Sequence, residues 1–153
     1  MRVRFETQTV TTKVALAEGL QFEGSIYLQR SPIHPSGLET PEELLNRSET
    51  FFPYHLSTGE VVLLPKTQVV YLTSDTLTSE DEADRYSAAK VMDLYVVMIG
   101  GAEFRGSTLV ELPPTHSRVL DFLNEPGSFF SVTQVTTTTC INRSHVRFVY
   151  AND

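Results

Sequence analysis

The sequence has little cysteine and no long apolar run. Cys140 is the single cysteine in 153 residues, so no disulfide can form within the chain and a cytoplasmic location is expected. No segment approaches the roughly 18 consecutive apolar residues that a membrane-spanning helix needs. The opening residues 1–6 include charged side chains where a signal peptide would have an apolar core. We therefore expect a cytoplasmic protein that does not contact a membrane.

Basic residues are also few. Lys and Arg number 12 against 19 Asp and Glu, which gives a formal net charge of −7. Non-specific binding to duplex nucleic acid depends on a basic face, so the overall charge argues against it, although it does not exclude a small basic site. The acidity is uneven, because residues 73–92 hold five acids and two bases.

Residue patterns typical of catalysis are missing as well. The four histidines do not have the spacing of metal ligands. No glycine-rich phosphate loop occurs, and no Ser/His/Asp or Cys/His arrangement stands at matched places along the chain. The sequence therefore predicts a protein that is not an enzyme and that uses neither a metal nor a cofactor.

What the sequence does contain is an internal repeat. Three blocks recur in the same order, with offsets of 82, 78 and 77 residues. The offsets shrink because the first copy has longer loops, which are the segments that tolerate insertion. Three blocks in one order indicate a duplication. The matched blocks are 19–25 with 101–107 (both Gly-x-x-Phe-x-Gly-Ser), 44–52 with 122–130, and 63–72 with 140–149.

The duplication divides the chain into an N-terminal arm (1–12), a first repeat (13–73), an acidic linker or short helix (74–92) and a second repeat (93–153). Each repeat has about 60 residues, which is near the lower limit for independent stability. We therefore expect the two repeats to pack together or to oligomerise.

Residue preferences predict the same elements in both repeats. Gly19 is expected to supply a positive φ in a tight turn, and Gly24 to mark a bend inside a strand. Residues 40–43 (Thr-Pro-Glu-Glu) are typical of a helix start. The predicted strands are 13–18, 21–29, 50–57, 60–65 and 68–73, then 93–99, 103–112, 128–135, 137–142 and 145–150; the predicted helices are 41–47 and 117–124, with a further short helix at 79–90 as one reading of the linker.

The glycine motifs resemble the first motif of the Sm-like proteins. Gly19-x-x-Phe22-x-Gly24 and Gly101-x-x-Phe104-x-Gly106 carry the resemblance, each preceded by alternating hydrophobic residues. The corners at 64–69 and 141–146 are similar to the second Sm motif in spacing, with Pro-Lys and Asn-Arg where that family has Arg-Gly. The chain looks like a bacterial family of tandem Sm-like proteins whose function is uncharacterised.

This resemblance implies a mainly β fold made of two tandem, strongly bent five-stranded small barrels, each with a short helix. Such barrels leave their outer strands with unpaired backbone groups. We expect the first repeat to pair with the second, and chains to associate further through edge strands into a homo-oligomer. Three chains would give a ring of six units, and a dimer is the alternative.

Four residues at equivalent positions are candidate RNA contacts: Asn46 and Asn124 at the C-terminal end of each predicted helix, and Lys66 and Arg143 at each corner. Each also has a purely structural interpretation, because asparagine often ends a helix and turn residues are often charged. The pairs at 51–52 and 129–130 (Phe-Phe) are likewise open to two interpretations, core packing or base stacking. Cys140 is expected to be a buried small apolar residue.

We therefore expect a non-catalytic, oligomeric interaction module that binds itself or a protein partner. The first alternative is a single-stranded RNA-binding protein that uses Lys66 and Arg143 on a ring surface, an option that the acidic charge disfavours. The second alternative is a small-molecule sensor with a pocket where the two barrels meet.

Overall fold

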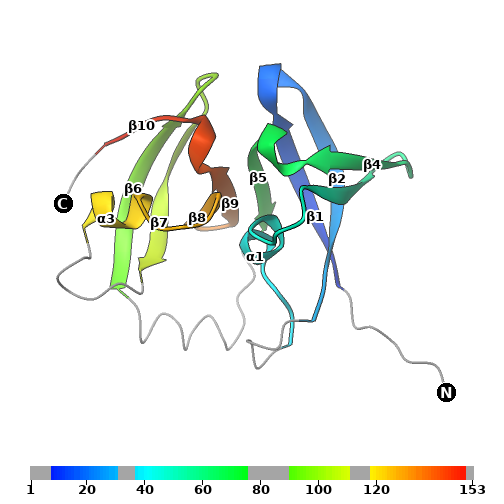
Figure 1. The fold of residues 1–153 in the computed structure, drawn as a ribbon, viewed down its shortest axis with the longest axis horizontal. Helices are drawn as coiled ribbons and strands as arrows, with labels where there is room; N and C mark the ends of the chain where they lie inside the picture. Colours follow the sequence, from blue (N-terminus) through cyan, green and yellow to red (C-terminus); the bar gives the residue numbers. More distant parts are fainter. Residues whose placement is uncertain (1–7, 31–36, 76–89, 111–117, 151–153) are drawn as a thin grey trace.

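A computed structural model describes residues 8–30, 37–75, 90–110 and 118–150. These residues form one antiparallel sheet of ten strands in the order β10-β6-β7-β8-β9-β5-β1-β2-β3-β4, together with two short helices (Figure 1). The predicted mainly β fold is confirmed. The bounds are β1 Gln8–Leu16, β2 Gln21–Leu28, α1 Pro41–Leu45, β3 Phe51–Leu56, β4 Val61–Pro65, β5 Val69–Asp75, β6 Lys90–Met98, β7 Glu103–Val110, α3 Val119–Leu123, β8 Phe129–Thr133, β9 Thr137–Asn142 and β10 Val146–Tyr150.

The strand order repeats within the sheet. The first repeat runs β5-β1-β2-β3-β4, and the second runs β10-β6-β7-β8-β9. The register repeats too: Phe51 pairs with Pro65 between β3 and β4, and the equivalent Phe129 pairs with Asn142 between β8 and β9. The two copies therefore have the same topology, and they join where β5 pairs with β9. The sequence predicts that the first repeat pairs with the second, and the β5–β9 ladder is this pairing.

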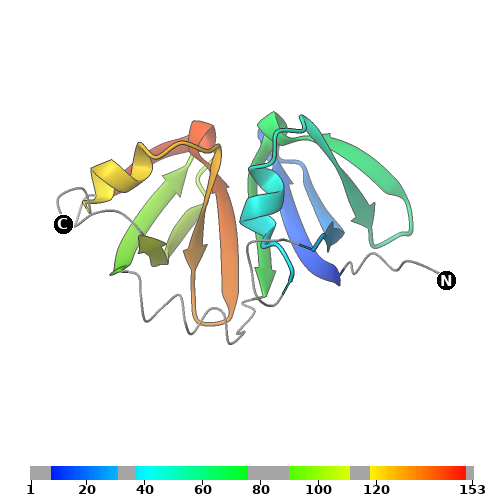
Figure 2. The same cartoon turned by 60° about the horizontal axis from the view of Figure 1, so that its bottom comes forward.

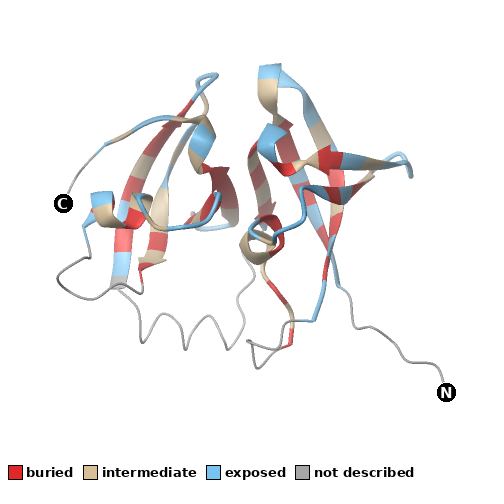
Figure 3. Cartoon of the chain, viewed as in Figure 1, coloured by how far each residue is buried: buried red, intermediate tan, exposed pale blue. Residues whose placement is uncertain are grey.

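Each repeat forms a curved sheet (Figure 2), and buried and exposed residues alternate along many of its strands (Figure 3). The buried side chains form two clusters, one centred on each repeat. Alternation of apolar and polar residues along the strands places one face of each strand inward. Helix α1 lies at the joint between the repeats, whereas α3 lies at the opposite side of the second repeat (Figure 2). The sheet does not close on itself, because its two end strands, β4 and β10, each have a single partner strand among the described residues.

Gly24 and Gly106 permit the sharp curvature. Each lies inside the second strand of its repeat, where the third strand crosses over it. A Cβ on Gly24 would lie 2.0 Å from the carbonyl oxygen of His55, and a Cβ on Gly106 would lie 2.4 Å from that of Thr133. Only glycine permits so close an approach of two backbones. Gly19 has the positive φ (+85°) that the sequence predicts for its turn.

Both helices are short, and α1 begins with a capping box. Thr40 accepts a hydrogen bond from the Glu43 amide, and the Glu43 carboxylate accepts one from the Thr40 amide. These contacts satisfy backbone donors that the first turn leaves free. The helices span 41–45 and 119–123, shorter than the predicted 41–47 and 117–124, and each ends at the candidate asparagine.

The first strand begins before residue 13, where the sequence predicts the first strand to start. Residues 8–12, which the sequence places in an extended N-terminal arm or edge strand, form the first half of β1 and pair with β2. Val10 and Thr12 are buried in this strand, so their spacing is that of a strand with one face in the core. Residues 74–75 and 90–92 likewise belong to β5 and β6. The helix expected at 79–90 lies almost wholly outside the described residues.

Substitution of Gly24 tests the close approach of the strands. We expect Gly24→Ala to lower the free energy of unfolding by about 3 kcal/mol, because the new methyl group overlaps the His55 carbonyl. Gly59→Ala is the matched control: Gly59 has a φ of +98° and open space around its Cα, so about 1 kcal/mol is expected from the backbone conformation alone. Urea denaturation of both variants measures the difference, and equal losses would contradict the expectation.

Candidate functional site

The two repeats meet through strand pairing and through side-chain hydrogen bonds. We call the β5–β9 pairing together with the α1–β8 contact the inner joint. Strands β5 and β9 pair antiparallel from Tyr71–Ile141 to Asp75–Thr137. The hydroxyls of Thr73 and Thr139 lie 3.0 Å apart across this ladder. Backbone pairing thus makes one continuous sheet from two repeats.

Asn142 fixes the corner of the second repeat to the corner of the first. Its side chain is buried, and its Nδ2 donates to the carbonyl of Val69 at 2.9 Å. Its Oδ1 accepts from the amide of Ser144 at 3.0 Å. His145 adds a second link, with Nε2 located 2.8 Å from the carbonyl oxygen of Thr67. Because a buried amide must find partners for both ends, Asn142 restricts the relative position of the two corners.

Asn46, one of the candidate residues, bridges the repeats from α1. Its Nδ2 donates to the Phe129 carbonyl at 3.0 Å, and the Phe129 amide donates to its Oδ1 at 2.9 Å. Asn46 is the C-cap of α1, with φ −90° and ψ 0°, so the end of the helix aims the side chain at the first residue of β8. Asn46 therefore lies at the end of the helix without adopting the left-handed conformation common there, and its side chain binds a partner 83 positions away.

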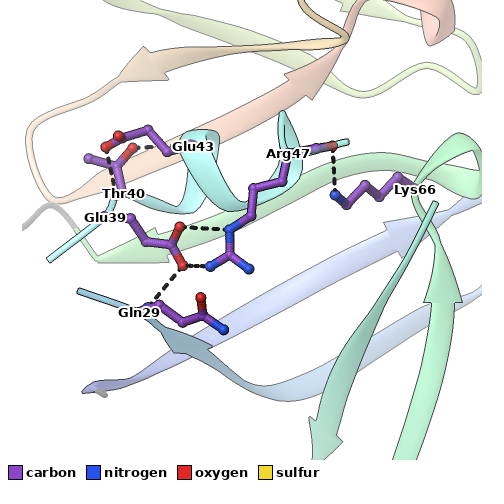
Figure 4. A network of polar contacts seen from close by, with 6 residues as sticks. All are labelled: Gln29, Glu39, Thr40, Glu43, Arg47 and Lys66. Carbon is purple, nitrogen blue, oxygen red and sulfur yellow. Dashed lines mark hydrogen bonds and ion pairs between the residues drawn. The ribbon is translucent and has the colours of Figure 1, made fainter. Parts of the chain in front are cut away.

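Lys66 supports the loop after α1. It is 8% exposed, and its Nζ donates to the Arg47 carbonyl at 3.0 Å (Figure 4). The Arg47 guanidinium in turn forms an ion pair with Glu39, whose carboxylate also accepts from the Gln29 amide at 2.9 Å. Burial lowers the pKa of Lys66 from its usual value. This network holds the helix, and with it Asn46, against the strands.

Arg143 plays the same part in the second repeat. Its Nη1 donates to the carbonyls of Gly127 at 2.9 Å and Phe129 at 3.1 Å, and its Nε donates to that of Leu123 at 3.2 Å. Its guanidinium also lies 5.1 Å from the ring centroid of Phe130. Both basic corner residues therefore bind carbonyl groups that follow a helix, where unpaired acceptors collect.

Side chains from each repeat also enter the core of the other. Phe129 and Cys140 are 2% and 1% exposed and belong to the hydrophobic cluster of the first repeat. In the opposite direction, the Tyr71 ring packs edge-on against Phe104, with centroids 4.8 Å apart. Burial raises the pKa of the Cys140 thiol to about 12, so this thiol is protonated and unreactive in the folded protein. The predicted apolar role of Cys140 is confirmed.

Glu42 and Ser131 form the remaining polar contact of the inner joint. Hydrogen bonding from Ser131 and the positive charge of Arg143 both favour the ionised Glu42 carboxylate and act to lower its pKa. Burial nevertheless dominates and raises the pKa of Glu42 above its usual value.

The open edges carry the equivalents of these residues, but with different exposure. Phe51 is 55% exposed where its equivalent Phe129 is buried, and Leu63 is 67% exposed where its equivalent Cys140 is buried. Phe148, the equivalent of Tyr71, is 45% exposed on β10. A large apolar side chain at a sheet edge usually indicates an interaction surface. The edges thus repeat the inner joint, without its partner strand.

Asn124 is the fourth candidate residue and the counterpart of Asn46. It caps α3 with φ −91° and ψ 3°, almost the same values. In the part of the chain that the structure describes, no hydrogen bond engages its side-chain amide. The structure therefore brings Asn46 to a partner and leaves Asn124 at the surface.

Sequence reasoning missed the differences between the copies. Asn142, Ser131 and Glu42 of the inner joint correspond to Pro65, Pro53 and Leu120, which are all apolar. This exchange is visible in the aligned repeats, and it distinguishes the joint from the edges once the pairing is known.

The histidines fall in separate places: His55 stacks edge-on against Tyr27, and His145 lies at the inner joint, while His34 and His116 are outside the described residues. Over the described ranges, no three His, Cys, Asp or Glu side chains gather into a metal-binding group. The helices in those ranges are too short to cross a membrane. Comparison of the chain with known protein families, with curated proteins and with solved structures gave no match.

Asn46→Ala tests the helix-mediated bridge. It removes the partner of the Phe129 amide while Arg143 still binds the Phe129 carbonyl, so we expect a loss of about 2 kcal/mol in the free energy of unfolding. A thiol-reactive dye should also label Cys140 faster in this variant, because the joint opens more often. Asn124→Ala, measured in dilute protein, is the control and should change neither quantity. Equal effects of the two variants would contradict the assignment.

The raised pKa of Glu42 predicts a pH-dependent effect of Glu42→Gln. The folded state binds the Glu42 proton more tightly than the unfolded state does, so the ionised carboxylate destabilises the native protein above its raised pKa. The stability of the Gln variant relative to the natural protein should therefore be greatest near neutral pH, should decline as the pH falls through the raised pKa toward the usual value of 4.5, and should level off below it. Denaturant titrations of both proteins between these pH values measure it. A relative stability that does not vary with pH would show that the carboxylate is not buried.

Proposed function

We propose that this protein is a non-catalytic, self-assembling module of Sm-like fold, in which each repeat is a strongly bent small barrel. Copies of the chain join head to tail, with β10 of one copy pairing with β4 of the next. One observation carries the proposal: the inner joint unites the last strand of the first repeat with the fourth strand of the second, and the two strands left open at the ends of the sheet are the complementary pair.

The inner joint also supplies the expected register. In the inner joint, Tyr71 pairs with Ile141 and Leu72 pairs with Cys140. The equivalent pairs between two copies are Phe148 with Leu64 and Val149 with Leu63. Both strands are end strands of the sheet, so each has one edge without a partner strand among the described residues. Unpaired edge strands are templates for addition of a further strand, and here the template and the strand that fits it are on the same chain.

Apolar side chains support self-pairing over pairing with an unrelated protein. Leu63 corresponds to Cys140, so it would enter the core of the second repeat of a neighbouring copy. Phe148 corresponds to Tyr71, so it would pack on Phe22 of a second copy, the equivalent of Phe104. Both side chains are exposed in the isolated chain. In the assembly, each would be buried against apolar side chains of the neighbouring copy, which is favourable.

A head-to-tail interface is heterologous, so the assembly is either a closed ring or an open filament. A ring leaves no free edge. Three chains would give six repeats in the ring, and two chains would give four. The Gly24 and Gly106 bends support the Sm-like assignment because they curve each repeat as a small barrel requires.

The contacts of the basic corner residues favour assembly over RNA binding. Lys66 and Arg143 are the residues that an RNA site would use, and both are occupied by backbone carbonyls of their own repeat. The place where the repeats meet is packed by Cys140, Phe129 and Tyr71, and this packing favours an assembly module over a small-molecule sensor.

Leu63→Lys tests the assembly. The side chain is 67% exposed in one chain, so the variant should fold normally, whereas an ammonium group in the proposed interface would lack a partner. Light scattering of the natural protein should give twice or three times the 17.2 kDa chain mass, and the variant should weaken assembly at least about tenfold. Val135→Lys, at a residue that is 97% exposed on the β8–β9 turn, is the control and should assemble normally. A natural protein that stays monomeric up to about 100 µM would reject the proposal.

A further inference from the structure

We infer that α3 is a second docking element of the same interface, in which Asn124 binds the backbone of Phe51 of a second copy and Leu120 packs on its Pro53. The inference rests on the proposed function, because it concerns the same head-to-tail pairing. It adds side-chain contacts that distinguish the strands of a second copy from those of the chain's own second repeat, which edge pairing alone does not do.

The geometry of the two helix ends supports the contact of Asn124. Asn46 and Asn124 follow helices of equal length and have nearly identical backbone angles, so both side chains leave the helix in the same direction. Asn46 uses this direction to bind the first residue of β8 on both its N–H and its C=O. The first residue of β3 is Phe51, and it has the same place in the pairing of its own strands as Phe129 has.

The loop before β3 leaves room for this contact. Gly127 lies beside Asn46 in the inner joint, and a Cβ added there would be 3.6 Å from the Asn46 amide, an ordinary van der Waals distance. The equivalent residue of the first repeat is Glu49, which is exposed. Its carboxylate therefore has solvent available.

The second contact differs in chemistry between the two joints. In the inner joint, Glu42 of α1 hydrogen-bonds Ser131 of β8. Their equivalents are Leu120 of α3, which is 62% exposed, and Pro53 of β3, which is also exposed. Both members of the pair have changed together from polar to apolar. In a polar pair the two side chains hydrogen-bond each other, and in an apolar pair they bury apolar surface together. A mixed pair would leave its polar member without a hydrogen-bond partner.

This exchange gives the interface its specificity. If β3 and β4 of a second copy displaced β8 and β9 from the inner joint, Pro53 would face Glu42 and could not donate a hydrogen bond to the carboxylate. A buried carboxylate without a donor is strongly unfavourable. Pro65 likewise could not replace the Asn142 amide that binds Val69. The chain thus distinguishes its own repeat from a second copy, and swapping between copies is disfavoured.

The experiment measures the dissociation constant of assembly by sedimentation equilibrium for four variants. Asn124→Ala should weaken assembly about tenfold, and Asn124→Asp should have a smaller effect because it still accepts from the Phe51 amide. Leu120→Glu should also weaken assembly. The double variant Leu120→Glu with Pro53→Ser should recover most of the loss, since it rebuilds the pair that Glu42 and Ser131 form.

Two controls separate assembly from folding and from the proposed function. Protection of the Cys140 thiol should be unchanged in all four variants, which shows that the inner joint is intact. If Leu63→Lys dissociates the oligomer while Asn124→Ala and Leu120→Glu assemble normally, the role of α3 is rejected and edge pairing stands. Failure of Pro53→Ser to rescue Leu120→Glu would reject the contact between these two residues. A natural protein that is monomeric rejects both proposals.

Discussion

The pairing of β5 with β9 is the contact on which the rest of the structure depends. A bent five-stranded unit of about 60 residues has two edges whose backbone groups need partners. Joining two such units through one edge of each satisfies half of this need and buries Phe129 and Cys140 in a shared core. Because the two edges used are different strands of the repeat, the joint is asymmetric. An asymmetric joint necessarily leaves one edge of each kind open, and the open edges are complementary to each other.

The polar residues around this pairing form a connected set of contacts, in which each one positions the next. Lys66 binds the loop after α1, the loop carries the Arg47–Glu39 ion pair, and the helix end presents Asn46 to β8. Each step satisfies a backbone or side-chain group that would otherwise be buried without a partner. Basic residues at corners are often assigned to ligand binding. Here Lys66 instead binds the loop that positions Asn46. The function of the corner is to hold the joint in register.

Much of the fold could be predicted from the sequence, because it depends on local chemistry. The repeated Gly-x-x-Phe-x-Gly pattern, the alternation of the strands and the Thr40–Glu43 capping box all act over a few residues, and the structure has each of them. The first half of β1 was assigned to an arm because its place in the sheet depends on pairing with β2 and on burial of Val10 and Thr12 in the core, which local residue preferences do not show. The same limit applies to the site. Asn46 and Asn124 have similar local sequence signals and nearly identical backbone angles, and what separates them is that Asn46 lies beside β8 and binds its first residue.

The divergence of the two copies follows from the different tasks of their edges. The inner joint forms once, within a chain, so its partner is always present at high effective concentration. What it needs is a fixed register, and hydrogen-bonded polar groups such as Asn142 and the Glu42–Ser131 pair restrict the register more than apolar groups do. An interface between chains must instead overcome the loss of translational freedom, which favours apolar burial. Their equivalents at the open edges are the apolar residues Pro65, Pro53 and Leu120. The direction of each replacement is therefore the one expected if the inner joint specifies geometry and the outer contact supplies affinity.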